Sequence, residues 1–219
     1  MNTAIIQLLV LAGIAVFLIL RLRSVLGTRE GFETPRTPID AGPERRNPGF
    51  KVIEGGPDPD IIDHVPEDSE AAAALAEMKR AEPSFAVGEF LSGARGAYEM
   101  ILMGFENGDM EQIRPFLGDD VAETFAEVIK MREDQGLTVE AEFIGVREVS
   151  LHDATFVTDT GEANVAVKFV GELISVVHNA KGDLVEGEPG KSKRQKDVWT
   201  FERMMGSDDP NWRLVATGE

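Results

Sequence analysis

Five side chains in this sequence are considered as general acids or bases, and they are scattered along the chain. They are His152, Asp153, Asp159, His178 and Tyr98. Acid–base catalysis requires such a group to project into a pocket with a shifted pKa. His152 and Asp153 are adjacent, so in a strand they point to opposite faces. Tyr98 falls on an apolar helical stripe, as a core residue does. The sequence has no Ser/His/Asp order, glycine-rich phosphate loop or His-x-x-x-His pair, so we predict no enzyme and no catalytic, cofactor-binding or metal-binding residues.

A second kind of chemistry is offered by residues 191–196 (KSKRQK), which are basic at four positions: Lys191, Lys193, Arg194 and Lys196. Near an anionic membrane leaflet each of these charges contributes up to about 1 kcal/mol, an attraction that falls off within a Debye length. Two interpretations stay open. The stretch is either a membrane- or partner-contact site, or a solvated hairpin loop whose charges balance Glu186 and Glu188.

The overall charge limits the classes of partner. The chain has 219 residues and a formal net charge of −17. From Ser84 onward there are 13 basic and 26 acidic residues. A surface this acidic repels nucleic acid at long range, so we exclude a general nucleic-acid binder. The absence of cysteine excludes disulfides, thiolate catalysis and Cys-ligated metal sites.

The first twenty residues (MNTAIIQLLVLAGIAVFLIL) are uncharged. A helix of this length is about 30 Å long, which matches the hydrocarbon core of a bilayer. A signal peptide normally opens with Lys or Arg, and none precedes the apolar run. We therefore predict a transmembrane anchor at residues 1–22. Arg21, Arg23 and Arg29 follow the span, so the positive-inside rule places the N-terminus outside and the remaining chain in the cytoplasm.

Residues 23–66 contain seven prolines and few large apolar side chains. Such a segment cannot bury enough surface to offset the entropy of ordering, so we predict a disordered linker. Residues 67–82 form a predicted helix, because acidic residues open it, alanines fill it, and Lys79 and Arg80 close it. Its apolar residues are Leu75 and Met78, and it could dock either on the following domain or on a partner.

The predicted folded domain covers residues 84–217. An amphipathic helix spans residues 90–105, and its small residues Gly93, Ala94, Gly96 and Ala97 make part of its surface thin enough for another element to pack closely. Asp109 caps a short helix, and Asp119 or Asp120 caps a third that ends at Gly136. The apolar period then changes from 3.6 to 2, with a slip of phase near Gly145 that suggests a bulge. The strands that follow lie at 165–169, 173–177, 198–202 and 212–216. Helices followed by a meander of strands predict an α+β fold, with helices on one face of an antiparallel sheet.

The ordered set of residues between Ala81 and Thr217 resembles the Tim44-like domain family. The residues that carry this resemblance are Phe85, Phe90–Leu91, Gly93–Ala94, Ala97–Tyr98–Glu99, Gly108–Asp109, Trp199–Thr200–Phe201 and Asp209–Pro210–Asn211–Trp212. The resemblance implies a cone-like fold of the nuclear-transport-factor-2 type, with a curved sheet and a deep apolar pocket. It also implies a place beside the inner membrane, since the mitochondrial member is a peripheral subunit of the presequence translocase and bacterial members combine an anchor, a linker and this domain. The chaperone-tethering role is not carried over, because that member's extended N-terminal region is replaced here by a spanning helix and a Pro/Gly-rich linker.

Together these observations predict a non-catalytic adaptor in the inner (cytoplasmic) membrane of a bacterium. Its folded domain would lie on the cytoplasmic side and would recruit or orient a protein partner in protein translocation or membrane-protein assembly. It would need no cofactor, and anionic lipid is a further candidate ligand of the basic stretch. The alternative interpretation is a membrane-tethered module that binds a lipid or another hydrophobic ligand.

Overall fold

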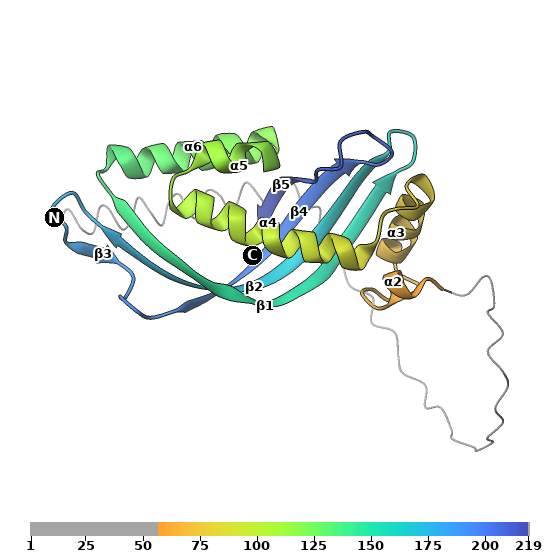
Figure 1. Ribbon diagram of the computed structural model, residues 1–219, viewed down its shortest axis with the longest axis horizontal. Coiled ribbons are helices and arrows are strands. Elements are labelled where there is room, and N and C mark those ends of the chain that lie inside the picture. The colour runs from red at the N-terminus through yellow and green to blue at the C-terminus, as the bar shows by residue number, and fades with distance from the viewer. Residues whose placement is uncertain (1–56, 219) are drawn as a thin grey trace, which may run out of the picture. The chain divides into compact units, whose positions relative to one another are not determined.

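The structure is a computed structural model that describes residues 57–218, which form a five-stranded antiparallel sheet with helices packed against it (Figure 1). The strand order is β1-β2-β4-β5, and β3 pairs with the last residues of β2. The strands are β1 (Thr138–Val157), β2 (Glu162–His178), β3 (Leu184–Glu186), β4 (Lys193–Met204) and β5 (Arg213–Gly218). This arrangement confirms the predicted α+β class.

The two longest strands, β1 and β2, have 20 and 17 residues, and both curve below α4 in Figure 1. The register between them shifts after Phe143, Val146 and Leu151. Each shift inserts an extra residue on β1, which bends the strand. The predicted slip of phase near Gly145 is therefore confirmed. The predicted division of residues 165–177 into two strands is wrong, because β2 is continuous.

The helices precede the sheet in sequence. They are α2 (Pro59–Ile62), α3 (Glu70–Ala81), α4 (Val87–Glu106), α5 (Met110–Ile113), the 3-10 turn η1 (Arg114–Phe116) and α6 (Asp119–Asp134). In Figure 1, α4 runs along the sheet, with α2 and α3 at one end and α5 and α6 on its far side. The predicted cap at Asp109 is confirmed, because its carboxylate accepts a hydrogen bond from the Gln112 amide at 3.1 Å. Asp119 and Asp120 lie inside the first turn of α6, whose N-cap is Gly118.

The core lies between α4 and the sheet. The Tyr98 ring stacks on Phe169 with centroids 4.4 Å apart and contacts Trp199 at 4.6 Å. Of the small residues predicted to allow close packing, Ala94 is buried in the core and Ala97 packs against it, but nothing lies within 4 Å of the Cβ positions of Gly93 and Gly96. Another glycine, Gly104, permits close approach, since an added Cβ there would lie 2.2 Å from a methyl group of Ile113. The small residue thus permits α4 to contact α5.

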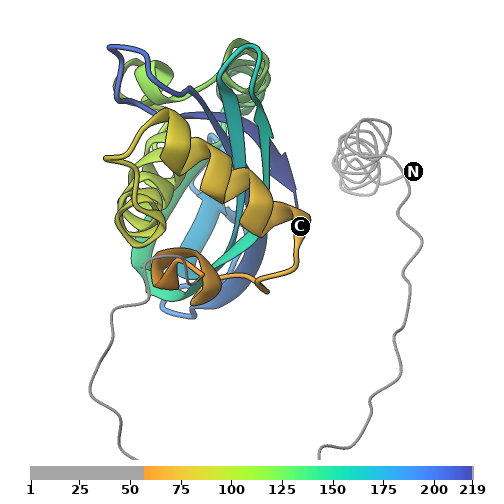
Figure 2. The same cartoon turned by 90° about the vertical axis from the view of Figure 1, so that its right-hand side faces the viewer.

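The folded part of the chain begins earlier than the sequence indicated. Residues 59–62, within the predicted linker, form α2, and Ile61 is buried. The helix predicted at residues 67–82 is α3, whose Leu75 and Met78 are fully buried against the domain. Figure 2 looks at this end of the molecule and shows α3 lying across the strands. Because α3 packs against the domain, the alternative that it docks on a partner protein is excluded.

One carboxylate holds these first helices to α4. The N-cap residue of α4, Ala86, has no side chain that could cap the helix, and Asp60 supplies the acceptor from α2 instead. Its two oxygens accept hydrogen bonds from the Val87 amide at 2.7 Å and the Gly88 amide at 3.0 Å. The Lys79 ammonium of α3 lies 2.7 Å from Asp60. Asp60 thus connects α2, α3 and the positive end of the α4 dipole.

Within residues 57–218, no helix is both long and apolar enough to cross a membrane. The anchor predicted at residues 1–22 and its flanking Arg21, Arg23 and Arg29 lie outside the described residues, as does most of the predicted linker.

Candidate partner-binding surfaces

The predicted basic stretch lies mainly in a strand rather than in a loop. β4 starts at Lys193 and is paired with β2 from that residue on, with Arg194 opposite Glu172. Because Trp199 and Phe201 point into the core, the alternation of side chains places Arg194 and Lys196 on the opposite, open face of the sheet. The four predicted residues are all exposed: Lys191, Lys193, Arg194 and Lys196. The backbone pairing of β4 thus fixes the positions of most of these charges.

A fifth cation, Arg147, joins this stretch from β1. Its guanidinium lies 2.5 Å from the Glu172 carboxylate, which also accepts a hydrogen bond from the Ser192 hydroxyl at 2.6 Å. The hydrogen bonds from Ser192 and Arg147, together with the nearby Arg194, lower the pKa of Glu172 and keep it ionised. Sequence reasoning missed Arg147 because it is 25 residues from Glu172 and meets it only through strand pairing.

We define the basic cluster as Arg147, Lys191, Lys193, Arg194 and Lys196. Two of its cations are compensated: Lys191 lies 2.8 Å from Glu188, and Glu172 is bound by Arg147. Five cations and these two carboxylates leave a net charge of +3 on a strongly acidic domain. Two of the charges are thus paired within the cluster, and a membrane or partner contact through the remaining charges stays a prediction.

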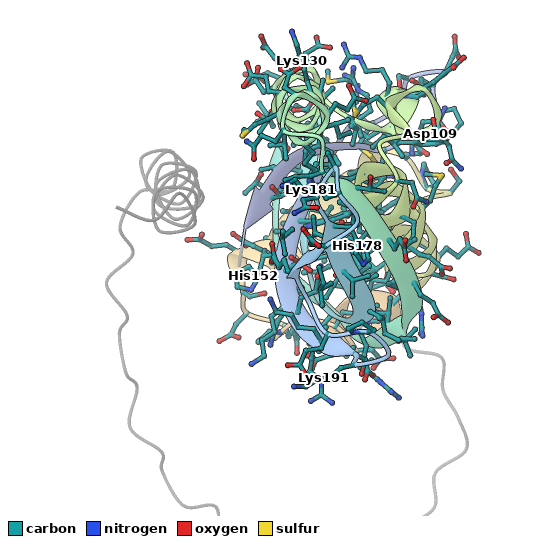
Figure 3. All side chains as sticks on the ribbon, turned by 90° about the vertical axis from the view of Figure 1, so that its left-hand side faces the viewer. Asp109, Lys130, His152, His178, Lys181 and Lys191 are labelled. Carbon is teal, nitrogen blue, oxygen red and sulfur yellow. The ribbon has the colours of Figure 1, made fainter. Side chains whose placement is uncertain are left out.

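The acid–base candidates are not brought together. His152 is the extra residue of the third register shift on β1 and is exposed, and Asp159 is exposed in the turn between β1 and β2. Asp153 accepts a hydrogen bond from the Ala154 amide. His178 ends β2, with its Nδ1 3.9 Å from Glu140. His152 directly follows Leu151, which is paired with Val167 of β2. Val167 precedes His178 by 11 residues, or about 35 Å along the strand, so the two histidines are far apart. Figure 3 shows His152 and His178 at separate places on the sheet.

Tyr98, the remaining candidate, is a core residue with a satisfied hydroxyl. That hydroxyl donates to Asp197 at 2.5 Å and accepts from the Gln195 amide at 3.1 Å. Burial, and then the hydrogen bond to Asp197, raise the pKa of Tyr98 above its usual value. Gly171 lies directly beneath the ring, since an added Cβ would be 2.6 Å from the hydroxyl. The Tyr98 hydroxyl is therefore kept protonated and is surrounded by its hydrogen-bond partners and by Gly171, which suits a structural role.

An open groove of about 530 Å³ lies between α5 and α6. Its lining is mostly apolar surface from Met110 of α5 and from Ala122 and Ala126 of α6, which are one helical turn apart. Ala122 is buried and Ala126 is exposed. Figure 3 places Asp109 and Lys130, which mark α5 and α6, at the end of the domain opposite Lys191. The groove and the basic cluster thus face in different directions.

The walls of the groove carry charged side chains: Glu111, Arg114, Asp119 and Glu123. Arg114 and Asp119 form an ion pair at 3.0 Å. In the described part of the chain no ion pair involves Glu111 or Glu123, and both are exposed. Residues 109–134 together contain eight acidic and three basic residues. Four of the seven residues that line the groove are therefore charged, and three of these four are acidic.

The position of α6 is fixed by Arg132. Its guanidinium lies 4.5 Å from the centre of the Phe105 ring, and it forms an ion pair with Glu106 at 3.7 Å. Burial raises the pKa of Glu106, while Arg132 opposes this shift. These contacts join the C-terminal half of α6 to the end of α4. The residues of α6 that line the groove, from Asp119 to Ala126, precede this contact in the helix.

No feature of the sequence indicates the groove. Ala122 and Ala126 have the spacing of any amphipathic helix, and no motif distinguishes them. They line the groove only because the fold places α5 beside α6. Among residues 57–218, no cluster of His, Asp and Glu side chains has an arrangement that could hold a metal ion.

A family model described as the Tim44-like domain matches residues 71–219. The human mitochondrial import inner membrane translocase subunit TIM44 is 24% identical over 159 residues, covering 71% of this chain and 35% of the relative. The Arabidopsis thaliana subunit TIM44-1 is 20% identical over 161 residues, covering 71% of this chain and 34% of the relative. The match thus spans about a third of the relatives' length. The intermembrane-space region of the chloroplast protein ARC6 aligns over 58% of this chain and 93% of its own, with 14% identity and a TM-score of 0.40, which is too low to support an argument.

Proposed function

This chain belongs to the Tim44-like domain family, and from this premise we propose that it is a non-catalytic adaptor at the inner membrane. It recruits or orients a protein partner in protein translocation or membrane-protein assembly. The observation that carries the proposal is the family match, which covers nearly all of the folded part of the chain. The relatives' names describe subunits of a mitochondrial inner-membrane import translocase. The scattered acid–base residues and the closed environment of Tyr98 agree with a role in binding.

The layout of the chain supports attachment to a membrane. In this proposal residues 1–22 span the bilayer, and Arg21, Arg23 and Arg29 hold the C-terminal side in the cytoplasm. The linker then extends from residue 23 to the start of α2, a shorter distance than the sequence alone suggested. As a flexible coil, its root-mean-square reach is about 30–35 Å. The domain therefore stays within a few nanometres of the inner (cytoplasmic) membrane of a bacterium.

The arrangement of the two surfaces suggests how the domain is oriented. Lys191 of the basic cluster lies on the lower side of Figure 3, and α2, where the linker joins, lies on the lower side of Figure 1, while α5 and α6 lie on the upper side of both views. Attraction of the cluster to anionic headgroups would direct the groove away from the bilayer. A partner in the cytoplasm or in a membrane complex could then reach it.

The finer fold assignment, a cone-like domain of the nuclear-transport-factor-2 type, forms part of this proposal, since long curved strands wrapping around α4 suit a cone. Such a cone would carry an apolar pocket and underlies the alternative of a lipid-binding module. Native mass spectrometry of the purified full-length protein distinguishes the two functions. A stoichiometric copurified lipid would favour the module, whereas its absence favours the adaptor.

The proposal is tested by chemical crosslinking in living cells. The full-length protein is compared with a variant in which residues 1–22 are replaced by an unrelated spanning helix. We expect both to capture the same membrane-associated protein, because the folded domain selects the partner and the anchor only concentrates it. Loss of that protein from the variant would place recognition in residues 1–22. Capture of lipid alone by both forms would replace the adaptor with the lipid module.

A further inference from the structure

We propose that residues 138–143, the first six residues of β1, form an open sheet edge that binds residues 50–54 of a second copy of this chain as an added strand. The inference rests on the membrane anchoring in the proposed function, because anchoring brings neighbouring copies together. It goes beyond the adaptor function, since it gives part of the linker a role in self-association.

β1 is an edge strand of the sheet, and its first six residues are the regular part of that edge. Among residues 57–218, β2 is the only strand that pairs with residues 138–143, and it does so without a register shift. Alternate residues of an edge strand direct their amide and carbonyl groups outward, where another strand can pair with them. Beyond Phe143 three register shifts bend β1, and the Arg95 guanidinium donates to the Val146 carbonyl oxygen at 2.8 Å. Strand addition is therefore favoured at the start of β1.

The two faces of this edge differ in chemistry. Phe143 packs against the core, so the alternation of side chains places Glu140 and Glu142 on the open face of the sheet. Both glutamates are exposed, and the side chain of Glu140 is 71% exposed although His178 lies 3.9 Å from it. The residues on the core side form a half-buried apolar row: Val139, Ala141 and Phe143. The edge therefore suits a strand with a cation on one face and apolar side chains on the other, and it disfavours a second β1, which would set glutamates beside glutamates.

Residues 50–54 (FKVIE) have the matching pattern. Three of residues 50–53 are large and apolar, whereas the 23 residues 27–49 contain only two such side chains. Val52 and Ile53 are β-branched, which favours a strand, and glycines flank the segment on both sides. The segment thus offers the apolar side chains and the cation that the edge of β1 selects.

An antiparallel register with Lys51 opposite Glu140 satisfies both faces of the edge. The Lys51 ammonium then meets the exposed carboxylate on the open face. Because neighbouring residues of a strand point to opposite faces, Phe50 and Val52 extend the apolar row on the core side. The pairing also gives hydrogen-bond partners to the outward backbone groups of β1.

The segment must come from another copy of the chain. The described chain begins at residue 57 beside α2, at the end of the domain opposite the start of β1 (Figure 1). The three residues from 54 to 57 span at most about 11 Å, whereas the fourteen residues of β1 that follow Phe143 extend over about 45 Å along the strand. The segment therefore cannot reach the edge of its own domain.

A neighbouring copy in the same membrane can supply the segment. Five residues bind weakly on their own, but anchoring both chains in one bilayer raises the effective concentration of the contact. Each copy has one segment to give and one edge to offer. The association is therefore head to tail, and it continues into a row of copies unless it closes into a ring.

The test uses disulfide formation in the full-length protein, whose natural sequence contains no cysteine. In the proposed register Ile53 lies opposite Thr138. Copies carrying Ile53→Cys are mixed in phosphatidylcholine vesicles with longer, tagged copies carrying Thr138→Cys, and the mixture is oxidised with copper phenanthroline. We expect a heterodimer to form at least tenfold faster than with Thr155→Cys, a control at an exposed position of the same strand. A chain that carries both Ile53→Cys and Thr138→Cys should give a ladder of oligomers.

Charge variants test the register without altering the cysteines. Glu140→Lys in the Thr138→Cys copy should slow the crosslink about fivefold, the effect of losing one exposed ion pair and gaining a repulsion. Adding Lys51→Glu to the Ile53→Cys copy should restore the rate, because the ion pair forms again with its charges exchanged. Equal rates at positions 138 and 155, or no rescue by the exchanged pair, would overturn the proposal.

Flotation of the vesicles distinguishes this failure from failure of the proposed function. If the protein floats with the vesicles and the crosslink does not form, strand addition is wrong, although the anchored adaptor stands. If the protein does not float, the anchoring is wrong, and the strand addition that depends on it fails too. Crosslinking to other proteins in living cells tests the adaptor function alone.

Discussion

Removing the Asp60 carboxylate should loosen the N-terminal helices from the rest of the domain. The substitution Asp60→Ala takes away the acceptor for the Val87 and Gly88 amides and one of the two partners of Lys79. Asp58 remains, with its oxygen 2.6 Å from the Lys79 ammonium.

The size of the effect follows from the structure. Loss of an N-cap costs about 0.5–2 kcal/mol. Partial burial alone would raise the pKa of Asp60, but the hydrogen bonds from Lys79, Gly88 and Val87 outweigh it and lower the pKa from 3.8 to about 2. At 1.36 kcal/mol for each pH unit between the two values, the upper limit is about 2.5 kcal/mol. The side chain is 29% exposed, so solvent screening reduces this figure. We expect a loss of about 1–2 kcal/mol, or roughly 2–8 °C in Tm.

The assay is urea unfolding of the full-length protein, followed by circular dichroism, at several pH values. The pKa of Asp60 is lower in the folded protein than in the unfolded chain, so ionised Asp60 contributes fully to the free energy of unfolding above about pH 4. This stabilisation is lost as the pH falls towards 2. The difference in unfolding free energy between the unsubstituted protein and Asp60→Ala should therefore be constant from pH 7 to pH 5 and should shrink below pH 4.

The matched control is Asp63→Ala, at an exposed carboxylate that directly follows the same helix. It should change the unfolding free energy by less than 0.5 kcal/mol. The reasoning would be refuted if Asp60→Ala were as stable as the control, or if its deficit persisted unchanged down to pH 3.

Three further substitutions test other parts of the account. Glu82→Ala removes the carboxylate that pairs with Arg203, whose side chain is only 9% exposed. We expect the free energy of unfolding in urea to fall by about 2–4 kcal/mol. An unchanged value would contradict the importance of this pair. Gly104→Ala forces a Cβ against Ile113 and should cost about 1–2 kcal/mol, a penalty that should shrink in an Ile113→Ala background measured as a double-mutant cycle. Tyr98→Phe removes the donor to Asp197 and should cost about 1–2 kcal/mol while leaving complementation in cells intact; loss of complementation with unchanged stability would point to a catalytic hydroxyl instead.

The sequence predicted the parts of the fold that depend on local patterns. The period of 3.6 identified α4 and α6, the period of 2 identified the strands, and Gly145 marked a bulge. Tyr98 was correctly placed in the core because it shares the apolar stripe of its helix. These features are set by residues close together in the chain, so a single sequence contains the information.

The parts that sequence reasoning missed depend on contacts between distant residues. Asp60 lies 27 residues before the amide that it caps, in a segment whose prolines suggested disorder. Arg147 reaches the basic stretch only across paired strands. Of the four small residues predicted to pack, Ala94 and Ala97 lie at the core, but the side of α4 that carries Gly93 and Gly96 is open, and the packing glycine is Gly104. No local pattern specifies which face of a helix meets a neighbour.

The central claim, that the folded domain acts by binding a protein, is tested most directly by site-specific photocrosslinking in living cells. A photoreactive residue is introduced into the full-length chain in place of Ala126 in the groove, Lys196 in the basic cluster or Thr155 on the open face of the sheet. We predict a discrete adduct with a membrane-associated protein from position 126 or position 196, and none from position 155. Absence of a protein adduct from all three positions, or lipid adducts alone, would contradict the account.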